Sequence, residues 1–172
     1  MLDAIKQRRS IRKFKEKDIE DQKLREVIKA GCFAPSAKHK YPYKILVVKD
    51  DAKKAKLSKI TPYASFLAQA PVGLILVSDD VDQWIEDCSV VAENVQLEAT
   101  NQGLGSCWIQ IKGHETEEET SEEVVKEVLS IPGEKRVLAI LAIGYPDETK
   151  SPHGDGEFDE REVYIGEYGR EF

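Results

Sequence analysis

The stretch QWIEDCSVVAENVQLEATNQ, residues 83–102, followed by GLGSCWIQI, residues 103–111, decides the fold of this chain. Apolar side chains recur in its first part every three or four residues, which is the period of an amphipathic helix. The length and small residues of this part predict a helix packed at the centre of the molecule. The second part is interpreted as a short strand or an extended loop. The predicted apolar stripe consists of Trp84, Cys88, Val91, Ala92, Val95 and Ala99.

The segments around this helix predict the other layers of the fold. Three stretches rich in β-branched or apolar residues predict strands, and one of them, Val72–Ser78, is apolar on both faces, as central strands are. The irregular alternation of elements favours an α+β fold, with a central mixed β-sheet flanked by helices. The predicted strands are Tyr43–Lys49, Val72–Ser78 and Arg136–Ile143, and the further helices are Leu2–Arg9, Glu20–Phe33, Asp50–Ile60 and the acidic segment Thr116–Ser130.

The character of the chain changes after Gly144-Tyr145-Pro146. Residues 147–172 hold nine acidic side chains against three basic ones, with scattered aromatic residues. We interpret them as a C-terminal arm that lies on another surface, such as that of a partner subunit, with Val163–Ile165 as a candidate strand. Because the sequence has no internal repeats and no Gly/Ser linker, residues 1–172 are predicted to form a single domain that includes this arm.

Composition excludes several classes of protein. A chain of 172 residues with 41% hydrophobic residues suffices for one compact domain. No apolar run approaches the roughly 20 residues of a membrane span, and the charged N-terminus does not resemble a secretory signal. Three cysteines without a CxxC motif indicate a reduced, cytoplasmic setting. The net charge of −7 argues against a nucleic-acid partner.

Charge is nevertheless polarised along the chain. Residues 1–17 hold seven basic side chains against two acidic ones, which predicts a site for a small anion near the N-terminus. The familiar nucleotide motifs GxGxxG and GxxxxGK[ST] are absent, as is the GxSxG motif of hydrolases. The three histidines do not have the spacing of metal ligands. A hydrolase with its own nucleophile and a zinc site are therefore disfavoured.

Three segments are candidates for the site. Arg8-Arg9-Ser10-Ile11-Arg12 combines guanidinium forks with a hydroxyl, which suits a phosphate, although a solvated basic surface is the alternative. Residues 34–43, APSAKHKYPY, place small residues beside prolines, so that their backbone can approach a flat ligand; an ordinary loop is the alternative. Residues 103–110, GLGSCWIQ, can present backbone N–H groups, whereas core packing is the commoner fate of Cys107 and Trp108.

Taken in order, these segments resemble the nitroreductase family of flavoproteins. Arg-Arg-Ser-Ile-Arg resembles that family's N-terminal flavin-phosphate motif, and APSAKHKYPY is similar to its A-P-S-S-x-N-x-Q-P-W loop. Residues 93–97, ENVQL, together with GLGSCWI resemble its central helix and the turn that follows, and residues 144–146 its G-Y-P. The order and spacing match over about residues 1–146. Each motif alone is weak, but four in the right order are specific.

The resemblance implies an intertwined homodimer of the nitroreductase fold with FMN bound non-covalently at its interface. NADH or NADPH would be the electron donor, and the flavin would then reduce nitroaromatic, quinone or related small acceptors in a ping-pong cycle. No protein nucleophile is required, because the cofactor carries the hydride chemistry. The alternatives are a flavin-binding redox sensor without turnover, an oxygen- or halide-directed member of the same fold, and an interaction module whose basic N-terminus binds acidic partners.

The resemblance also implies roles for individual residues. Arg12 would stabilise negative charge on the pyrimidine side of the flavin, and the backbone N–H of Gln110 would face flavin N5, with Ile111 beside it. Four residues would reach the flavin from the partner subunit: Pro35, Ser36, Ala37 and His39. The phosphate and ribityl chain would be held by Arg8, Arg9 and Ser10, with Lys150 and Arg161 as candidates to complete the site. Departures from the family pattern at Ala37, His39, Tyr41 and Tyr43 make the contacts of that loop the least defined.

Overall fold

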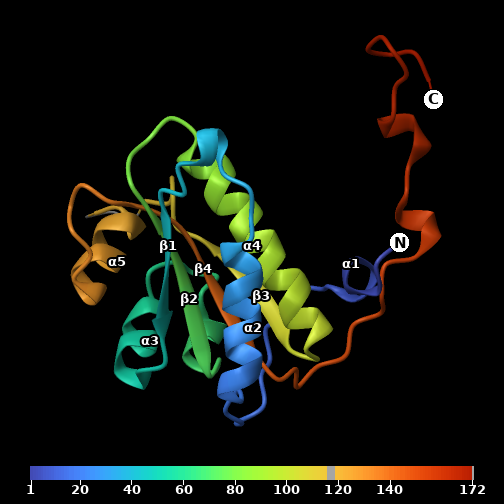
Figure 1. Ribbon diagram of the computed structural model, residues 1–172. Helices are drawn as coiled ribbons and strands as arrows, with labels where there is room; N and C mark the ends of the chain where they lie inside the picture. The colour runs from blue at the N-terminus through green and yellow to red at the C-terminus, as the bar shows by residue number, and fades with distance from the viewer. Residues whose placement is uncertain (116–118, 172) are drawn as a thin grey trace.

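Four antiparallel strands form the centre of the molecule in a computed structural model that describes residues 1–115 and 119–171. The strands are β1 (Tyr43–Val48), β2 (Val72–Ser78), β3 (Gly105–Gln110) and β4 (Arg136–Gly144), in the spatial order β1-β2-β4-β3 (Figure 1). The predicted α+β class is confirmed, but the predicted mixed sheet needs correction. Each pair of neighbouring strands in the sheet is antiparallel. Parallel pairing among the described residues is limited to an isolated bridge between Ser10 and Ser106.

Helices cover both faces of the sheet, which explains why its central strands are apolar throughout. All seven residues of β2 are buried, as are eight of the nine in β4. On one face α4 (Trp84–Asn101) and α2 (Asp21–Cys32) enclose one core, and on the other α3 (Asp51–Leu57), the 3-10 helix Ser65–Ala68 and α5 (Ser121–Leu129) enclose a second one (Figure 1). Strands that helices cover on both faces are apolar on both faces, because a polar side chain on either face would be buried away from water.

The predicted central helix is confirmed as α4. All six residues of its predicted stripe are buried. Helix α2 packs against it, and Gly31 makes this approach close, because a Cβ atom at that position would lie 2.7 Å from Cγ2 of Val95. The segment after α4 forms β3, a strand rather than an extended loop, since β4 supplies a pairing partner for Gly105–Gln110 along its whole length.

Helices α3 and α5 begin at capping residues. Asp50 caps α3 by accepting a hydrogen bond from the N–H of Lys53, and Thr120 and Glu123 form a capping box at the start of α5. The expected acidic helix therefore begins at Ser121. Its predicted first residues, Thr116, Glu117 and Glu118, lie outside the described residues. Helix α1 is limited to Asp3–Gln7.

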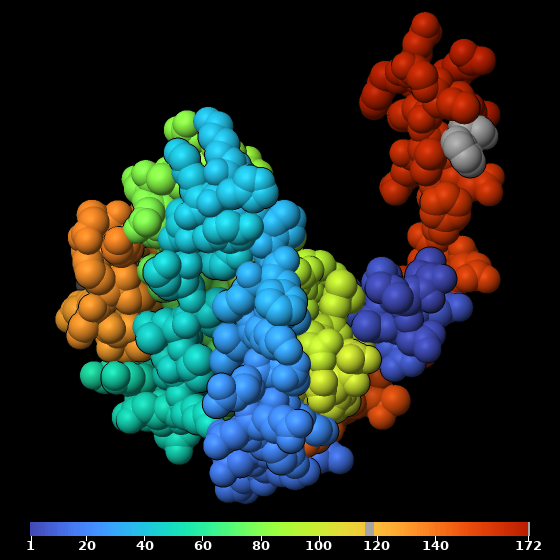
Figure 2. Space-filling model, viewed as in Figure 1, coloured from blue at the N-terminus to red at the C-terminus, as the bar shows by residue number. Residues whose placement is uncertain are grey.

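The C-terminal arm leaves the body of the molecule beside α1 and extends away from it (Figures 1 and 2). Between residues 147 and 171 it contains two single-turn 3-10 helices, Asp155–Glu157 and Glu160–Glu162, and the strand expected around Tyr164 is reduced to one bridge with Glu171. Large apolar side chains of the arm are exposed, including Tyr168 at 94%. Phe172 lies outside the described residues. None of the helices described is both long enough and apolar enough to cross a membrane.

Candidate functional site

The N-terminal basic segment lies along the outer edge of β3. Ser10 and Ser106 form a parallel bridge, and the N–H of Ile11 donates to the carbonyl of Ser106 at 2.9 Å. Gly105 allows this approach, because a Cβ atom there would lie 2.8 Å from Cβ of Ile11. The hydroxyl of Ser106 accepts a hydrogen bond from Nε2 of Gln96 on α4. The segment is thus packed on the body, as its apolar residues predict.

Basic side chains from two distant parts of the sequence meet beside this edge. Nζ of Lys150 donates to the carbonyl of Ser10 at 2.5 Å, and a guanidinium N–H of Arg9 donates to the carbonyl of Ser151 at 2.6 Å. Both residues line a cleft of about 440 Å³, together with Gly103 and Gly105. Lys150 therefore joins the predicted anion-binding segment.

Glu148 is a member of this cluster that the sequence motifs do not reveal. Its Oε1 accepts hydrogen bonds from the backbone N–H groups of Arg12 and Lys13, and its Oε2 lies 3.9 Å from Nζ of Lys150. These bonds, the one from Arg12 above all, lower the pKa of Glu148 below its ordinary value. The carboxylate of Glu148 thus holds the backbone of Arg12 and not its guanidinium group.

Arg8 and Arg12 flank the bridge at Ser10. Arg8 is half-buried at the end of α1, and Arg12 is exposed with its guanidinium carbon 5.9 Å from the centre of the Phe66 ring.

Burial raises the pKa of Cys107, an effect that the charge of Arg12 and a hydrogen bond with Ser10 partly oppose. A buried thiol with a raised pKa is a poor nucleophile.

The open edge of β3 continues past the basic cluster to Gln110. Ile111 donates its N–H to the carbonyl of Leu138 on the β4 side. Because N–H groups alternate in direction along an antiparallel ladder, the N–H of Gln110 points to the open edge. Its side chain is already engaged, since Oε1 accepts from Trp108 and Nε2 donates to Lys112. The backbone of Gln110 is thus available to a ligand, whereas the Ile111 side chain is fully buried in the core.

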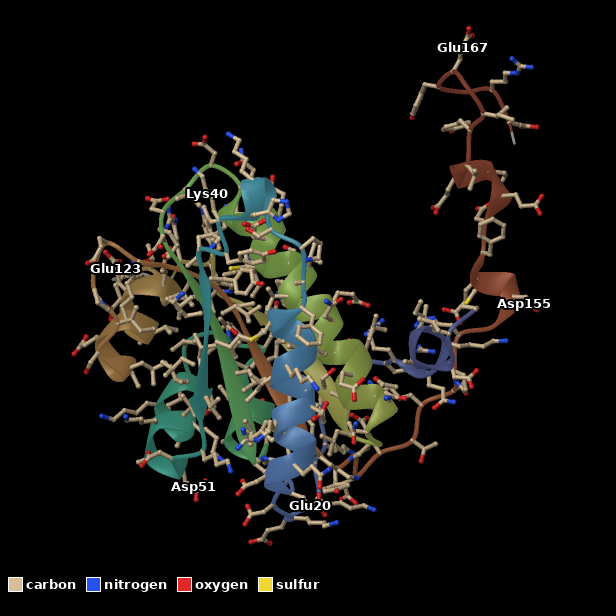
Figure 3. The ribbon with its side chains drawn as sticks, in the orientation of Figure 1. Glu20, Lys40, Asp51, Glu123, Asp155 and Glu167 are labelled. Carbon is tan, nitrogen blue, oxygen red and sulfur yellow. The ribbon has the colours of Figure 1, made fainter. Side chains whose placement is uncertain are left out.

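The predicted loop of Pro35, Ser36, Ala37 and His39 lies away from the N-terminal basic segment. Ser36 and Ala37 are bonded to Asp87 near the start of α4, whereas the N-terminal segment is bonded to Ser106 opposite Gln96. Asp87 and Gln96 are separated by about 13 Å along the helix, at 1.5 Å per residue. Lys40 of this loop lies at one end of the molecule, far from Asp155 beside α1 (Figure 3). One chain therefore does not bring the two groups of predicted site residues together.

Arg161 is not part of the basic cluster within this chain. It belongs to the exposed 3-10 helix Glu160–Glu162 of the arm, and its guanidinium pairs with the carboxylate of Asp159 at 2.7 Å. That pair raises the pKa of Arg161 and lowers that of Asp159. Of the two candidates to complete the phosphate site, only Lys150 lies beside Ser10.

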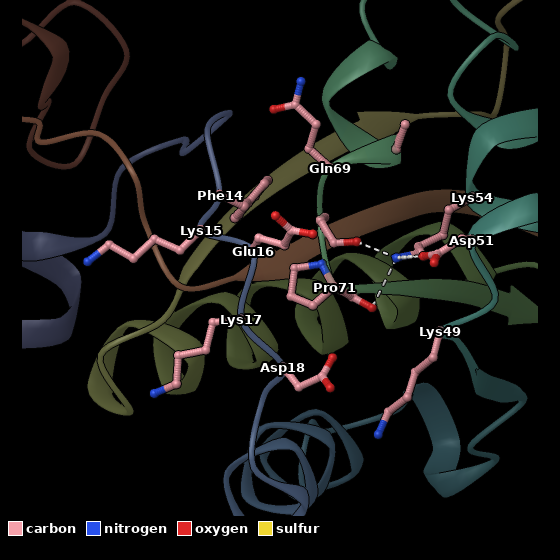
Figure 4. A pocket seen from close by; sticks show the side chains of 12 residues that line it. Phe14, Lys15, Glu16, Lys17, Asp18, Lys49, Asp51, Lys54, Gln69 and Pro71 are labelled. Atoms are coloured by element: carbon pink, nitrogen blue, oxygen red, sulfur yellow. Dashed lines mark hydrogen bonds and ion pairs between the residues drawn. The ribbon is translucent and has the colours of Figure 1, made fainter.

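A second, larger cavity of about 680 Å³ lies between the segment 14–18, the start of α3 and the turn before β2 (Figure 4). Its buried cation, Lys54, is 4% exposed and donates to the carbonyls of Ala70 and Pro71 and to the carboxylate of Asp51. Because all three donors of the ammonium group have partners, Lys54 ties α3 to the turn before β2 rather than awaiting a ligand.

Comparison with known proteins places this arrangement in a family. A family model described as "Putative TM nitroreductase" matches residues 1–163. The chain belongs to this nitroreductase family. Among solved structures, the fold of this nitroreductase is similar to an FMN-dependent nitroreductase from Clostridium difficile R20291, with a TM-score of 0.95 and 35% identity, covering 98% of this chain and 100% of that one.

Relatives of this chain carry more than one activity in their names. A protein of Archaeoglobus fulgidus named "Putative NADH dehydrogenase/NAD(P)H nitroreductase" is 30% identical over 155 residues, which is 87% of each chain. An iodotyrosine deiodinase of Thermotoga neapolitana is 25% identical over 183 residues, covering 91% of this chain and 94% of that protein. The chain therefore has relatives that are named for different activities.

Proposed function

We propose that this nitroreductase is an FMN-dependent oxidoreductase that uses NADH or NADPH to reduce small acceptors. The observation that carries the proposal is the outer edge of β3, along which the basic segment at Ser10, with Lys150 beside it, is followed by the outward N–H of Gln110. A ligand with an anionic phosphate at one end and a flat hydrogen-bonding ring at the other fits this order of groups. FMN has this form, and FMN is named in a similar structure.

Basic and hydroxyl groups of the N-terminal segment would hold the phosphate and ribityl chain. Lys150 supplies a positive charge beside Ser10, and a ligand can approach the backbone at Gly103, where no atom lies within 4 Å of the position that a Cβ atom would take. Bidentate guanidinium groups suit a phosphate dianion. The residues proposed for this role are Arg8, Arg9, Ser10 and Lys150.

The chain would tune the ring of the cofactor through two groups. When bound, FMN supplies hydride transfer between the nicotinamide and the acceptor in alternating half-reactions. The outward N–H of Gln110 would donate a hydrogen bond to N5 and hold the ring in register with the strand. The positive charge of Arg12 would stabilise negative charge on the pyrimidine side of the ring, because preorganised charge lowers the energy of such a state.

The second half of each site would come from a partner subunit. Within one chain, the loop carrying Pro35, Ala37 and His39 and the edge of β3 are anchored about 13 Å apart along α4. In a homodimer, the loop of one chain can complete the site of the other, and the exposed apolar side chains of the arm would gain a surface to cover. Flat molecules such as quinones and nitroaromatics are the acceptors proposed.

The colour of the purified protein tests this proposal first. We expect a yellow protein whose flavin absorption is bleached by NADH or NADPH under anaerobic conditions and restored by a quinone or a nitroaromatic compound. A colourless protein that takes up no added FMN contradicts the proposal. A yellow protein that is bleached slowly and shows no turnover with any acceptor would instead indicate a flavin-binding redox sensor.

A further inference from the structure

A buried carboxylate, that of Asp87, has no role in the site as derived so far. It lies in the first turn of α4 and is 5% exposed. Burying a carboxylate is costly unless hydrogen bonds compensate for the lost water. Both of its oxygens point to one loop, the segment Pro35–Tyr41.

The bonds of Asp87 form a chain through this loop. Oδ2 accepts from the hydroxyl of Ser36 at 2.7 Å, and Oδ1 accepts from the N–H of Ala37 at 2.9 Å. The hydroxyl of Ser36 in turn accepts from the N–H of Tyr41 at 2.9 Å, so both ends of the loop are tied to the same carboxylate. Ser36 is therefore an internal bridge, and its hydroxyl hydrogen is not available to a cofactor.

The loop that these bonds hold is strained. Lys38, His39 and Tyr41 have φ values of 54°, 54° and 47°, a left-handed conformation that costs roughly 1–2 kcal/mol for a residue with a Cβ atom. Such a conformation persists only where the surroundings enforce it, and it is concentrated at ligand-binding sites. The N–H groups of His39 and Lys40 also donate to the carbonyls of Ser36 and Ala37, and the Tyr41 ring lies edge-on to that of Tyr43. Lys38, His39, Lys40 and Tyr41 are nevertheless all exposed.

We infer that Asp87 is a positioning residue for the cofactor: through Ser36 and Ala37 it holds the strained loop 35–41 in the conformation that meets the flavin of the partner subunit. This inference rests on the proposed function, since it assigns the loop to the flavin. It differs from a purely structural role, because the exposed residues of the loop contribute little to the core. Loss of the carboxylate is expected to release the loop while the rest of α4 stays packed.

The test compares Asp87→Ala with Glu86→Ala in the full-length protein as purified. Glu86 is exposed in the same helical turn, so its removal takes away the same charge from the helix N-terminus without touching the loop. Hydrogen exchange reports the loop directly. We expect the amides of Ala37 and Tyr41 to exchange faster in Asp87→Ala and to remain as in the parent protein in Glu86→Ala.

The dissociation constant for FMN, from flavin fluorescence, is the second readout. We expect Asp87→Ala to weaken FMN binding on the order of tenfold, as loss of hydrogen bonds to a buried charged group does. Ser36→Ala, which removes the bridge but leaves the bond to Ala37, should have a smaller effect. Asp87→Asn, which keeps an acceptor for Ala37 and a partner for Ser36, should restore most of the affinity.

The outcomes separate the inference from the proposed function. Faster loop exchange with unchanged FMN affinity would overturn the positioning role and leave the proposed function intact. Unchanged exchange in Asp87→Ala would overturn the inference as well, and so would an affinity loss equal in Glu86→Ala. If the parent protein itself bound no FMN, the proposed function would fail first. Should Asp87→Ala not fold, Ser36→Ala provides both readouts.

Discussion

Three basic residues follow Pro146, and the two that the sequence offers as phosphate ligands, Lys150 and Arg161, differ in their surroundings. Nζ of Lys150 lies at the carbonyl of Ser10, whereas Arg161 is paired with Asp159 on the exposed arm. We expect Lys150→Ala to weaken FMN binding about tenfold, the effect of a lost charged hydrogen bond, and Arg161→Ala to leave the affinity nearly unchanged. Titration of both variants with FMN checks this prediction, and equal losses would contradict it.

A second prediction at this scale concerns the pKa of Glu20. The hydroxyl of Tyr145 donates to this carboxylate, and that bond is the main reason why the pKa of Glu20 is lowered to about 2. A lowered pKa stabilises the folded state at pH values above the ordinary pKa near 4.5, and this contribution is lost as the pH falls from there through about 2.

The substitution Tyr145→Phe removes the hydrogen bond and should raise the pKa of Glu20 towards its ordinary value. Carbon-detected NMR of the labelled carboxylate measures this shift directly. Tyr63→Phe serves as the control, because Tyr63 is 79% exposed and makes no contact with Glu20. A pKa of Glu20 that is unchanged in Tyr145→Phe would show that the hydrogen bond from its own backbone and the contact with Lys17, rather than Tyr145, hold the carboxylate ionised.

Local motifs could be predicted from the sequence because their residues are neighbours in the chain. Arg8, Arg9 and Ser10 follow one another, and the structure places them together at the end of α1. Asp87 and Glu148 could not be found in this way, because their partners are 50 and 136 residues away. For Asp87 the sequence held one signal: it lies three residues after Trp84, on the apolar face of its helix. A carboxylate buried there requires hydrogen-bonding partners.

Among the elements, β3 and the N-terminal segment depend on the absence of a side chain at Gly105. A methyl group there would lie 2.8 Å from Cβ of Ile11 and would push the segment off the strand. We expect Gly105→Ala to lower the free energy of unfolding by about 1–3 kcal/mol, as overpacking does, and to weaken FMN binding. Gly133→Ala, where no atom lies within 4 Å, is the matched control. Urea denaturation of both variants checks the prediction, and similar values would contradict it.

Helix α3 is tied to the turn before β2 by the buried ammonium group of Lys54. Lys54→Ala would leave the carbonyls of Ala70 and Pro71 without a donor, and we expect a loss of about 2–3 kcal/mol in the free energy of unfolding. Its neighbour Lys53 is exposed, so Lys53→Ala should change the stability little. Chemical denaturation measures both, and an unaltered stability of Lys54→Ala would show that water replaces the ammonium group.

Periodicity could predict the elements themselves but not their pairing. The stripe of α4 and the apolar run of β2 are local patterns, and both elements occur where the sequence indicates. Whether residues 105–110 formed a strand depended on β4, which lies about thirty residues further along the chain. The same non-local pairing decided that the sheet is antiparallel rather than mixed.

For the whole molecule, the exposed arm and a site shared between two subunits lead to a prediction of the molecular mass in solution. We expect light scattering to give twice the 19.4 kDa of a single chain. Removal of residues 155–172 should shift the protein towards the monomer, since the exposed apolar side chains of the arm would lose the surface that they cover. A full-length protein that scatters as a monomer yet retains FMN would contradict a site shared between subunits.

The separation of the two groups of site residues along α4 has a genetic consequence. If each site takes its basic cluster from one chain and its loop from the other, then Lys150→Ala and Asp87→Ala lie in different halves of the same site. A mixed dimer of the two defective chains would hold one site with both defects and one with none. At FMN concentrations too low to fill either variant, the two impaired alleles expressed together should therefore regain part of the activity by intragenic complementation, whereas either allele alone should not.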